Sequence, residues 1–128
     1  MASSDFEAVY ADLRERMIRA AAGHTVVTDK PGSLVLHAPI QNPLKPRERM
    51  WFGAIQIKKN YVSYHLMPVY SHRELREKVS PDLAKRMQGK SCFNFKTPAR
   101  ALFDELERLT AEGAKIYETP FEVRYGEC

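Results

Sequence analysis

Two strand-like segments in the middle of the chain constrain its fold more than any other feature. Residues 50–57 and 61–66 are rich in aromatic and β-branched side chains, and only Lys58, Lys59 and Asn60 separate them. Side chains of these types fill a pleated, half-buried surface, and so short a connection joins two antiparallel strands in a hairpin. We therefore expect the centre of the protein to be an antiparallel sheet.

A second hairpin is predicted to precede this one. Residues 25–28 and 33–38 are short β-rich runs on either side of a turn that contains Pro31 and Gly32. Proline presets one turn torsion, and glycine tolerates a positive φ angle. The next stretch, residues 39–49, contains three prolines and is predicted to be an exposed loop, because proline neither continues a helix nor donates to a strand ladder.

One more strand is expected at residues 91–96. The alternation there places Phe93 and Phe95 on one face of the strand and Cys92 and Asn94 on the other. The phenylalanine face is then the face that turns towards the core.

Amphipathic helices are predicted near both ends of the chain. Ser4 and Glu7 have the spacing of a capping box at the start of the first helix, and Gly23 supplies a stop. A Thr-Pro pair at residues 97–98 begins the second helix, which is expected to end before Gly113. The apolar positions at helical spacing are Phe6, Val9, Tyr10, Leu13, Met17 and Ala21 in the first helix and Ala99, Leu102, Phe103, Leu106 and Leu109 in the second.

Together these segments predict an α+β fold. Two helices packed on one face of an antiparallel sheet of about five or six strands form a two-layer sandwich. The length and the hydrophobic share of 44% are those of a single globular domain, residues 1–128. The acidic tail, residues 117–128, leaves two alternatives open: a short edge strand at residues 121–125 or a loose end.

Charge is unevenly distributed along the chain, whose net charge is +4. Residues 45–100 carry thirteen basic and four acidic side chains, a local balance of +9, whereas residues 101–128 carry three basic and seven acidic ones, a balance of −4. A basic region of this kind indicates an anionic partner. The alternatives are that the two regions attract each other or that solvated lysines cover a sheet edge.

The sequence predicts a cytoplasmic protein without membrane contact. Its apolar runs are too short to cross a bilayer, and its first residues lack the basic start and apolar stretch of a secretory signal. Cys92 and Cys128 lie far apart and supply no disulfide framework. The oligomeric state is left open.

Three stretches of sequence carry a resemblance to a known family. They are RMWFGAIQIKKNYVSYHLMPVY from residue 49, SPDLAKRMQGKSCFNFK from residue 80 and TPARALFDEL from residue 97. This region, from the loop before Met50 to the last predicted helix, resembles the YdhG-like bacterial domain of unknown function, and the phrase GKSCFNF is its most specific part. The resemblance implies the order helix, antiparallel sheet, helix. Because some members are described as frataxin-like iron chaperones, it also implies an iron-handling role.

Iron, as a hard cation, prefers clustered carboxylate oxygens. Frataxin-like proteins are associated with an acidic surface on and after the first helix, but here the acidic residues of that helix are interleaved with Arg14, Arg16 and Arg19. The nearest cluster lies on the last predicted helix, where Asp104 and Glu107 are the candidate metal ligands. Solvated helix charges are the alternative interpretation.

The sequence does not favour an enzyme. His65 and Cys92 project from the same side of the sheet if Tyr64 and Phe93 point into the core, and a histidine that lowers the pKa of a thiol activates it as a nucleophile. An inert thiol and a hydrogen-bonded histidine are the alternative. The sequence contains no phosphate-binding glycine loop, nucleophile elbow or zinc-ligand spacing, and whether any catalysis occurs is left open.

Aromatic and basic residues gather in the central region and define a candidate ligand groove. Aromatic rings stack on planar ligands such as bases, and lysines neutralise phosphates. In the alternative interpretation, the aromatic residues fill the core and the lysines cap turns. The groove candidates are Trp51, Tyr64, His65, Lys90, Cys92 and Asn94.

The sequence as a whole predicts a small binding or accessory protein for a small molecule or a metal, with iron handling implied by resemblance. The alternative is a protein that binds an anionic ligand or nucleic acid through its basic central region, and nucleic acid is the less favoured of these two.

Overall fold

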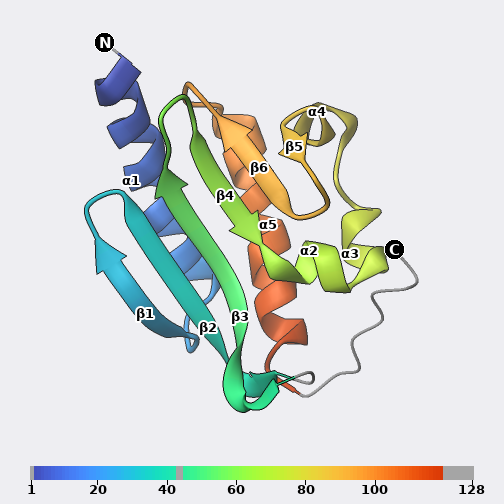
Figure 1. Ribbon diagram of the computed structural model, residues 1–128. Coiled ribbons are helices and arrows are strands. Elements are labelled where there is room, and N and C mark those ends of the chain that lie inside the picture. The colour runs from blue at the N-terminus through green and yellow to red at the C-terminus, as the bar shows by residue number, and fades with distance from the viewer. Residues whose placement is uncertain (1, 43–44, 120–128) are drawn as a thin grey trace.

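The computed structural model describes residues 2–42 and 45–119, which form one antiparallel sheet and five helices (Figure 1). The strands are β1 (Thr25–Lys30), β2 (Ser33–Asn42), β3 (Lys45–Ile57), β4 (Val62–Leu66), β5 (Met87–Gln88) and β6 (Cys92–Phe95). The helices are α1 (Ala2–Ala20), α2 (Met67–Ser71), α3 (Arg73–Arg76), α4 (Pro81–Ala84) and α5 (Arg100–Ile116). The sheet has the order β1-β2-β3-β4-β6-β5. The predicted α+β fold is confirmed, and the predicted alternatives for residues 121–125 lie outside the described residues.

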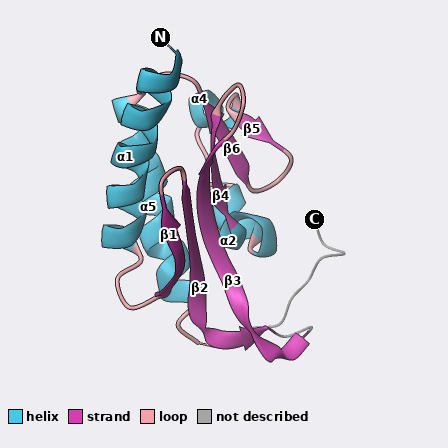
Figure 2. Ribbon diagram, turned by 60° about the vertical axis from the view of Figure 1, so that its left-hand side comes forward, coloured by secondary structure: helices cyan, strands magenta, loops and turns pink. Residues whose placement is uncertain are grey.

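The two long helices, α1 and α5, lie together on one face of the sheet (Figure 2). Each carries an apolar stripe, and the hydrophobic effect buries both stripes against the inward-pointing side chains of the strands. The fully or almost fully buried residues of this core include Val9, Leu13, Met17, Tyr64, Phe93, Phe95, Phe103 and Leu106. The opposite face of the sheet is covered by neither long helix.

Two glycines permit close packing around these helices. A Cβ atom at Gly53 of β3 would lie 2.9 Å from the methyl carbon of Met17 in α1 and 2.9 Å from the carbonyl oxygen of His65. A Cβ atom at Gly113 would lie 2.8 Å from the ring of Pro68 in α2. The prediction that the last helix ends before Gly113 is therefore wrong: α5 continues through this glycine because α2 packs against it.

Both predicted helix starts also need correction. α1 begins at Ala2, so Ser4 lies inside the helix and is not its N-cap. α5 begins at Arg100, with Ala99 as its N-cap, rather than at the Thr-Pro pair of residues 97–98. The carbonyl of Ala99 accepts the first helical hydrogen bond, from the amide of Phe103 at 2.9 Å, which sets this boundary.

The predicted loop at residues 39–49 is instead a continuation of β2 and β3. Gln41 pairs with Arg49 in an antiparallel ribbon that extends beyond the rest of the sheet. The register shifts between His37 and Gln41, the interval that contains Pro39. A proline lacks the amide hydrogen that a ladder needs, but here it interrupts the pairing without ending it.

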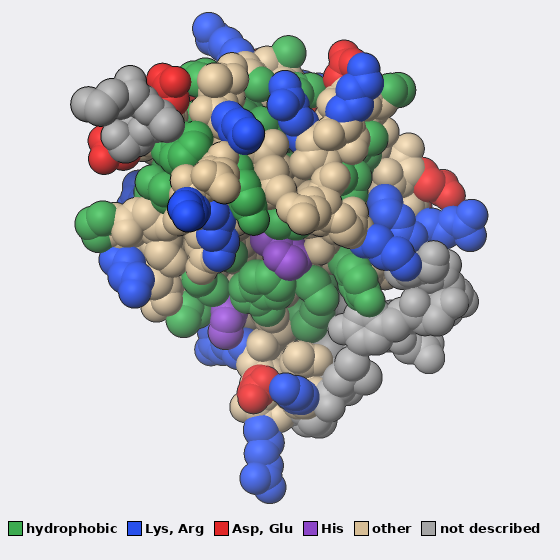
Figure 3. All heavy atoms as spheres, turned by 45° about the horizontal axis from the view of Figure 1, so that its top comes forward, with side chains coloured by type: hydrophobic (Ala, Val, Ile, Leu, Met, Phe, Trp, Pro, Cys, Tyr) green, Lys and Arg blue, Asp and Glu red, His purple; other side chains and the backbone are tan. Residues whose placement is uncertain are grey.

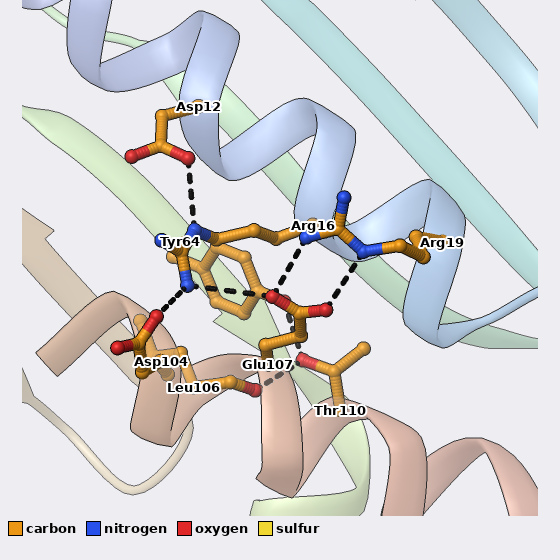
Figure 4. A network of polar contacts seen from close by, with 8 residues as sticks. All are labelled: Asp12, Arg16, Arg19, Tyr64, Asp104, Leu106, Glu107 and Thr110. Carbon is orange, nitrogen blue, oxygen red and sulfur yellow. Dashed lines mark hydrogen bonds and ion pairs between the residues drawn. The ribbon is translucent and has the colours of Figure 1, made fainter. Parts of the chain in front are cut away.

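A buried hydrogen bond joins the sheet to α5 (Figure 4). The hydroxyl groups of Tyr64 in β4 and Thr110 in α5 are bonded to each other, and both residues are fully buried. The Thr110 hydroxyl donates to the carbonyl oxygen of Leu106 at 2.7 Å, so the Tyr64 hydroxyl is the donor in the bond between the two side chains. Burial raises the pKa of Tyr64, which keeps this donor protonated.

We predict that the two partners of this bond do not contribute equally to stability. Thr110→Val leaves the buried Tyr64 hydroxyl without an acceptor and is expected to lower the free energy of unfolding by about 2 kcal/mol. Tyr64→Phe leaves the bond from Thr110 to Leu106 intact and is expected to cost about 1 kcal/mol. Urea denaturation of both variants and of the double variant measures the difference. The double variant should lose less than the sum. Strictly additive losses would contradict the bond itself, and a larger loss in Tyr64→Phe than in Thr110→Val would contradict the assigned donor.

Candidate functional site

The outer face of the sheet, opposite α1 and α5, brings most of the predicted groove residues together. Cross-strand neighbours of an antiparallel sheet point to the same side. His65 of β4 pairs with Cys92 of β6, and Ser63 pairs with Asn94 in the same two strands. We define the outer face by the residues Val35, His37, Trp51, Ser63, His65, Cys92 and Asn94.

A β-bulge in β3 places Trp51 on this face. Leu36 of β2 pairs with Gly53, but the next residue, His37, pairs with Trp51, so Phe52 is an extra residue in the ladder. Without this shift, Trp51 would point to the same side as Gly53, two residues away. The bulge leaves Phe52 fully buried in the core and Trp51 partly exposed on the other side.

The Trp51 side chain packs against His65. The centroids of the two rings lie 4.4 Å apart, and their planes are inclined by 70°. On its other side, His65 Nε2 lies 2.6 Å from the Ser91 hydroxyl oxygen. Burial lowers the pKa of His65, so the ring is neutral at pH 7. Its tautomer decides whether Nε2 accepts a hydrogen bond from the Ser91 hydroxyl or donates one to it.

Cys92 and Asn94 continue the outer face across β6. The Cys92 sulfur lies 3.7 Å from Asn94 Oδ1, and Asn94 Nδ2 donates to Gln88 Oε1 at 2.7 Å. Burial raises the pKa of the Cys92 thiol, an effect that the nearby charge of Lys58 partly offsets. His65 is hydrogen-bonded to Ser91 and not to Cys92. The thiol is therefore protonated at neutral pH, and among the described residues no base is hydrogen-bonded to it.

Lysines border the outer face at both ends of the strands. Lys58 and Lys59 are exposed in the β3–β4 turn, and Lys90 is exposed in the β5–β6 turn beside Ser91. These three lysines form no ion pair with any residue that the structure describes. Figure 3 shows this side of the molecule, where Lys and Arg side chains surround a centre of apolar, histidine and uncharged polar groups and acidic side chains are few.

The prediction that Tyr64 lines the ligand groove is wrong. This residue alternates with His65 in β4 and is fully buried on the inner face, where it bonds Thr110. The other five groove candidates, Trp51, His65, Lys90, Cys92 and Asn94, lie on or beside the outer face. Ser91, which the sequence analysis missed, immediately precedes β6, and only its hydroxyl contact with His65 marks it.

The carboxylates of Asp104 and Glu107, the candidate metal ligands, lie on the helix side and contact arginines of α1 (Figure 4). Arg16 Nη1 lies 2.6 Å from Asp104 Oδ1 and 3.3 Å from Glu107 Oε1, and Arg19 Nε donates to Glu107 Oε2 at 2.9 Å. These bonds hold the pKa of both carboxyl groups below the ordinary values. No group of three or more His, Cys, Asp or Glu side chains suited to a metal ion occurs among the described residues.

Arg16 is the centre of this network. Its side chain is only 10% exposed, and a third carboxylate, that of Asp12 in α1, accepts from its Nε at 2.8 Å. The guanidinium group also lies over the ring of Phe103, 5.9 Å from the ring centroid. The network therefore links α1 to α5. The carboxylate oxygens of Asp104 and Glu107, which a metal ion would need as ligands, already accept hydrogen bonds from the arginines.

Comparison with known proteins gives no relative: no family model, curated protein or solved structure matches this chain. The YdhG-like resemblance and the iron-handling role that it implies therefore stay predictions. Among the residues that the structure describes, no helix combines the length and apolar character needed to span a membrane.

We predict that neutralising the two candidate ligands destabilises the helix pair. The double substitution Asp104→Asn with Glu107→Gln removes two of the three carboxylates around the largely buried Arg16 and should lower the thermal midpoint. Glu112, also in α5, forms an exposed ion pair with Lys78, which lies between α3 and α4. Glu112→Gln is therefore the control and should change the midpoint little.

The same double variant tests the metal prediction. Anaerobic titration with ferrous iron, followed by NMR of labelled protein at a temperature where both forms are folded, reports on each residue. Saturable changes at residues 104 and 107 that the double variant loses would support an iron site there. A spectrum that does not respond in the wild type removes these residues from the iron hypothesis.

We also predict a slowly reacting Cys92 thiol. In a Cys128→Ser variant it is the only thiol of the chain. Because burial raises its pKa, alkylation by iodoacetamide at pH 7.5 should be slower than that of a small free thiol, and the rate should still be rising at pH 9. His65→Gln should not slow it. Fast alkylation at pH 7 that depends on His65 would instead indicate an activated nucleophile.

Proposed function

We propose that the protein is a binding protein, not an enzyme, and that it takes an anionic ligand with a planar ring on the outer face of its sheet. The observation that carries the proposal is the packing of Trp51 against the neutral ring of His65 on a sheet face that lysines border at both ends. An aromatic side chain binds a planar ring by stacking, and the lysines neutralise its acidic groups.

The separation of charge between the two sides of the protein supports this proposal. Three carboxylates of α1 and α5, those of Asp12, Asp104 and Glu107, pair with arginines of α1, whereas Lys58, Lys59 and Lys90 form no ion pair with any described residue. Among the strand residues, Asp29 and Glu48 are the acidic ones. Asp29 faces α1 and forms an ion pair of 2.6 Å with Arg14, so it does not oppose an anion on the outer face.

Polar groups on the outer face add hydrogen-bonding capacity. Asn94 is half-buried on this face, whereas its cross-strand neighbour Ser63 is buried, with its hydroxyl 3.5 Å from the carbonyl oxygen of Gln56. An amide group next to an aromatic platform recognises the edge of a heterocyclic ring. The protonated Cys92 thiol and the absence of a carboxylate partner for His65 among the described residues favour binding over catalysis.

Iron handling remains the expectation that follows from the family resemblance. Its candidate ligands, Asp104 and Glu107, serve as partners of Arg16 and Arg19. For this reason the outer face, rather than the helix side, is the site on which the proposal rests.

We predict that binding of ATP, used as a probe with both a planar ring and phosphates, depends on the lysines of the outer face. The chain has one tryptophan, Trp51, so a stacked ring should quench its fluorescence directly. The double substitution Lys58→Gln with Lys90→Gln should weaken binding roughly threefold to tenfold at low salt, because each lost charge lowers the positive potential over the face even where the probe contacts only one of the two lysines.

The double substitution Arg108→Gln with Lys115→Gln is the matched control for charge, because it also removes two positive charges. Both residues are exposed in α5, on the other side of the sheet. This variant should bind like the wild type. Equal weakening in both variants would mean that the probe responds to total charge and not to the outer face.

A further inference from the structure

We infer that the polymer form of such a ligand, single-stranded nucleic acid, is the partner of the outer face. This inference rests on the proposed function and narrows it to one class of ligand. Its evidence is the shape of the face, the position of its charges and the nature of its aromatic side chains.

The shape of the outer face suits an extended chain better than a small molecule. Small ligands bind in clefts that enclose most of their surface. Two hollows that described residues form lie away from this face, one of about 470 Å³ between Tyr10 of α1 and the β1–β2 turn and one of about 330 Å³ between Ser80 and α5. The outer face is instead a sheet surface left open by both long helices. A nucleic acid strand can lie across such a surface and contact it at several points.

The charges stand at two ends of this surface. The Ile57 amide donates to the carbonyl of Gly32 at 2.9 Å, so the β1–β2 turn, which follows Lys30, lies at the same end of the sheet as the β3–β4 turn, which contains Lys58. Lys90 lies at the other end of β4, because the Leu66 amide at that end bonds the Ser91 carbonyl at 2.9 Å.

The distance between these ends fits several phosphates. The five residues of β4 span roughly 17 Å at about 3.3 Å per residue. That length corresponds to about five phosphates at the stacked spacing of about 3.4 Å, and to fewer in an extended strand. A single mononucleotide is too short to engage both groups of lysines together with Trp51, whereas an oligonucleotide is not.

The face also offers a stacking platform and a polar group that can read a base edge. Trp51 and His65 present their rings near the end of β4 that Lys90 borders, and Asn94 lies two residues along β6 from Cys92, the cross-strand neighbour of His65. Every base has a π-face for an aromatic side chain, but in a duplex that face is already stacked on its neighbours. The arrangement therefore favours a single strand over a duplex.

The experiment compares four probes by fluorescence anisotropy and by quenching of Trp51: a labelled single-stranded 12-mer, its blunt duplex, AMP, and a polyphosphate of matched charge. The 12-mer is expected to quench Trp51 and to bind more tightly than the other three. Neutralisation of three or four phosphates should weaken its binding roughly 20- to 50-fold between 50 and 200 mM salt, at about −0.7 per phosphate. Trp51→Leu should weaken it about five- to hundredfold, and Trp51→Phe, which keeps a stacking ring, much less.

Each other result decides against part of the argument. If AMP binds as tightly as the 12-mer and quenches Trp51, the proposed function stands and the polymer inference fails. Tighter binding of the duplex overturns the preference for a single strand, and equal binding of polyphosphate without quenching overturns the stacking platform. If no probe binds although circular dichroism shows a folded protein, both the inference and the proposed function fail.

Discussion

The Arg16 side chain, held between α1 and α5, is the interaction on which the arrangement of the layers depends. A guanidinium group that is only 10% exposed needs partners for its charge, and it takes them from both helices: Asp12 on its own, Asp104 and Glu107 on the other. These bonds hold α1 and α5 together as neighbours on the face of the sheet where the hydrophobic effect buries their apolar stripes. Neither long helix covers the other face, which is therefore open to a ligand.

Most of the fold was predictable from the sequence because its signals are local. The apolar stripes of the two long helices and the alternation of Phe93 and Phe95 depend only on residues close in the chain. The structure buries all of these residues except Ala99 and Leu102, which are partly buried. The errors arose where distant contacts override local preference. Glycine is a common residue at helix ends, but Gly113 lies inside α5, where it allows Pro68 to pack closely. The prolines around Pro39 predict a loop, but pairing between β2 and β3 keeps this segment in the sheet.

The candidate site was predictable in part. The alternation in β4 and β6 places His65, Cys92 and Asn94 on one face as soon as Tyr64 and Phe93 are assigned to the core. Two features lay beyond the sequence. The β-bulge that turns Trp51 outward is a property of the pairing with β2, and the Ser91 contact with His65 depends on how the chain turns before β6. Arg16 contacts Asp104 and Arg19 contacts Glu107, each across 88 residues of sequence. No spacing pattern reveals contacts between residues so far apart in the chain.

The free edge of the sheet at β1 has a consequence for how molecules of this protein meet one another. Val26 and Val27 are the large hydrophobic residues that are most exposed in the described chain, at 45% and 52%, and they lie in an edge strand whose outer amides have no neighbour in the sheet. The ladder of β1 is irregular between Val26 and Thr28. A bulge at this point bends the edge and prevents a second copy from adding a long, regular strand, so the irregularity protects crowded solutions of the protein from edge-to-edge aggregation.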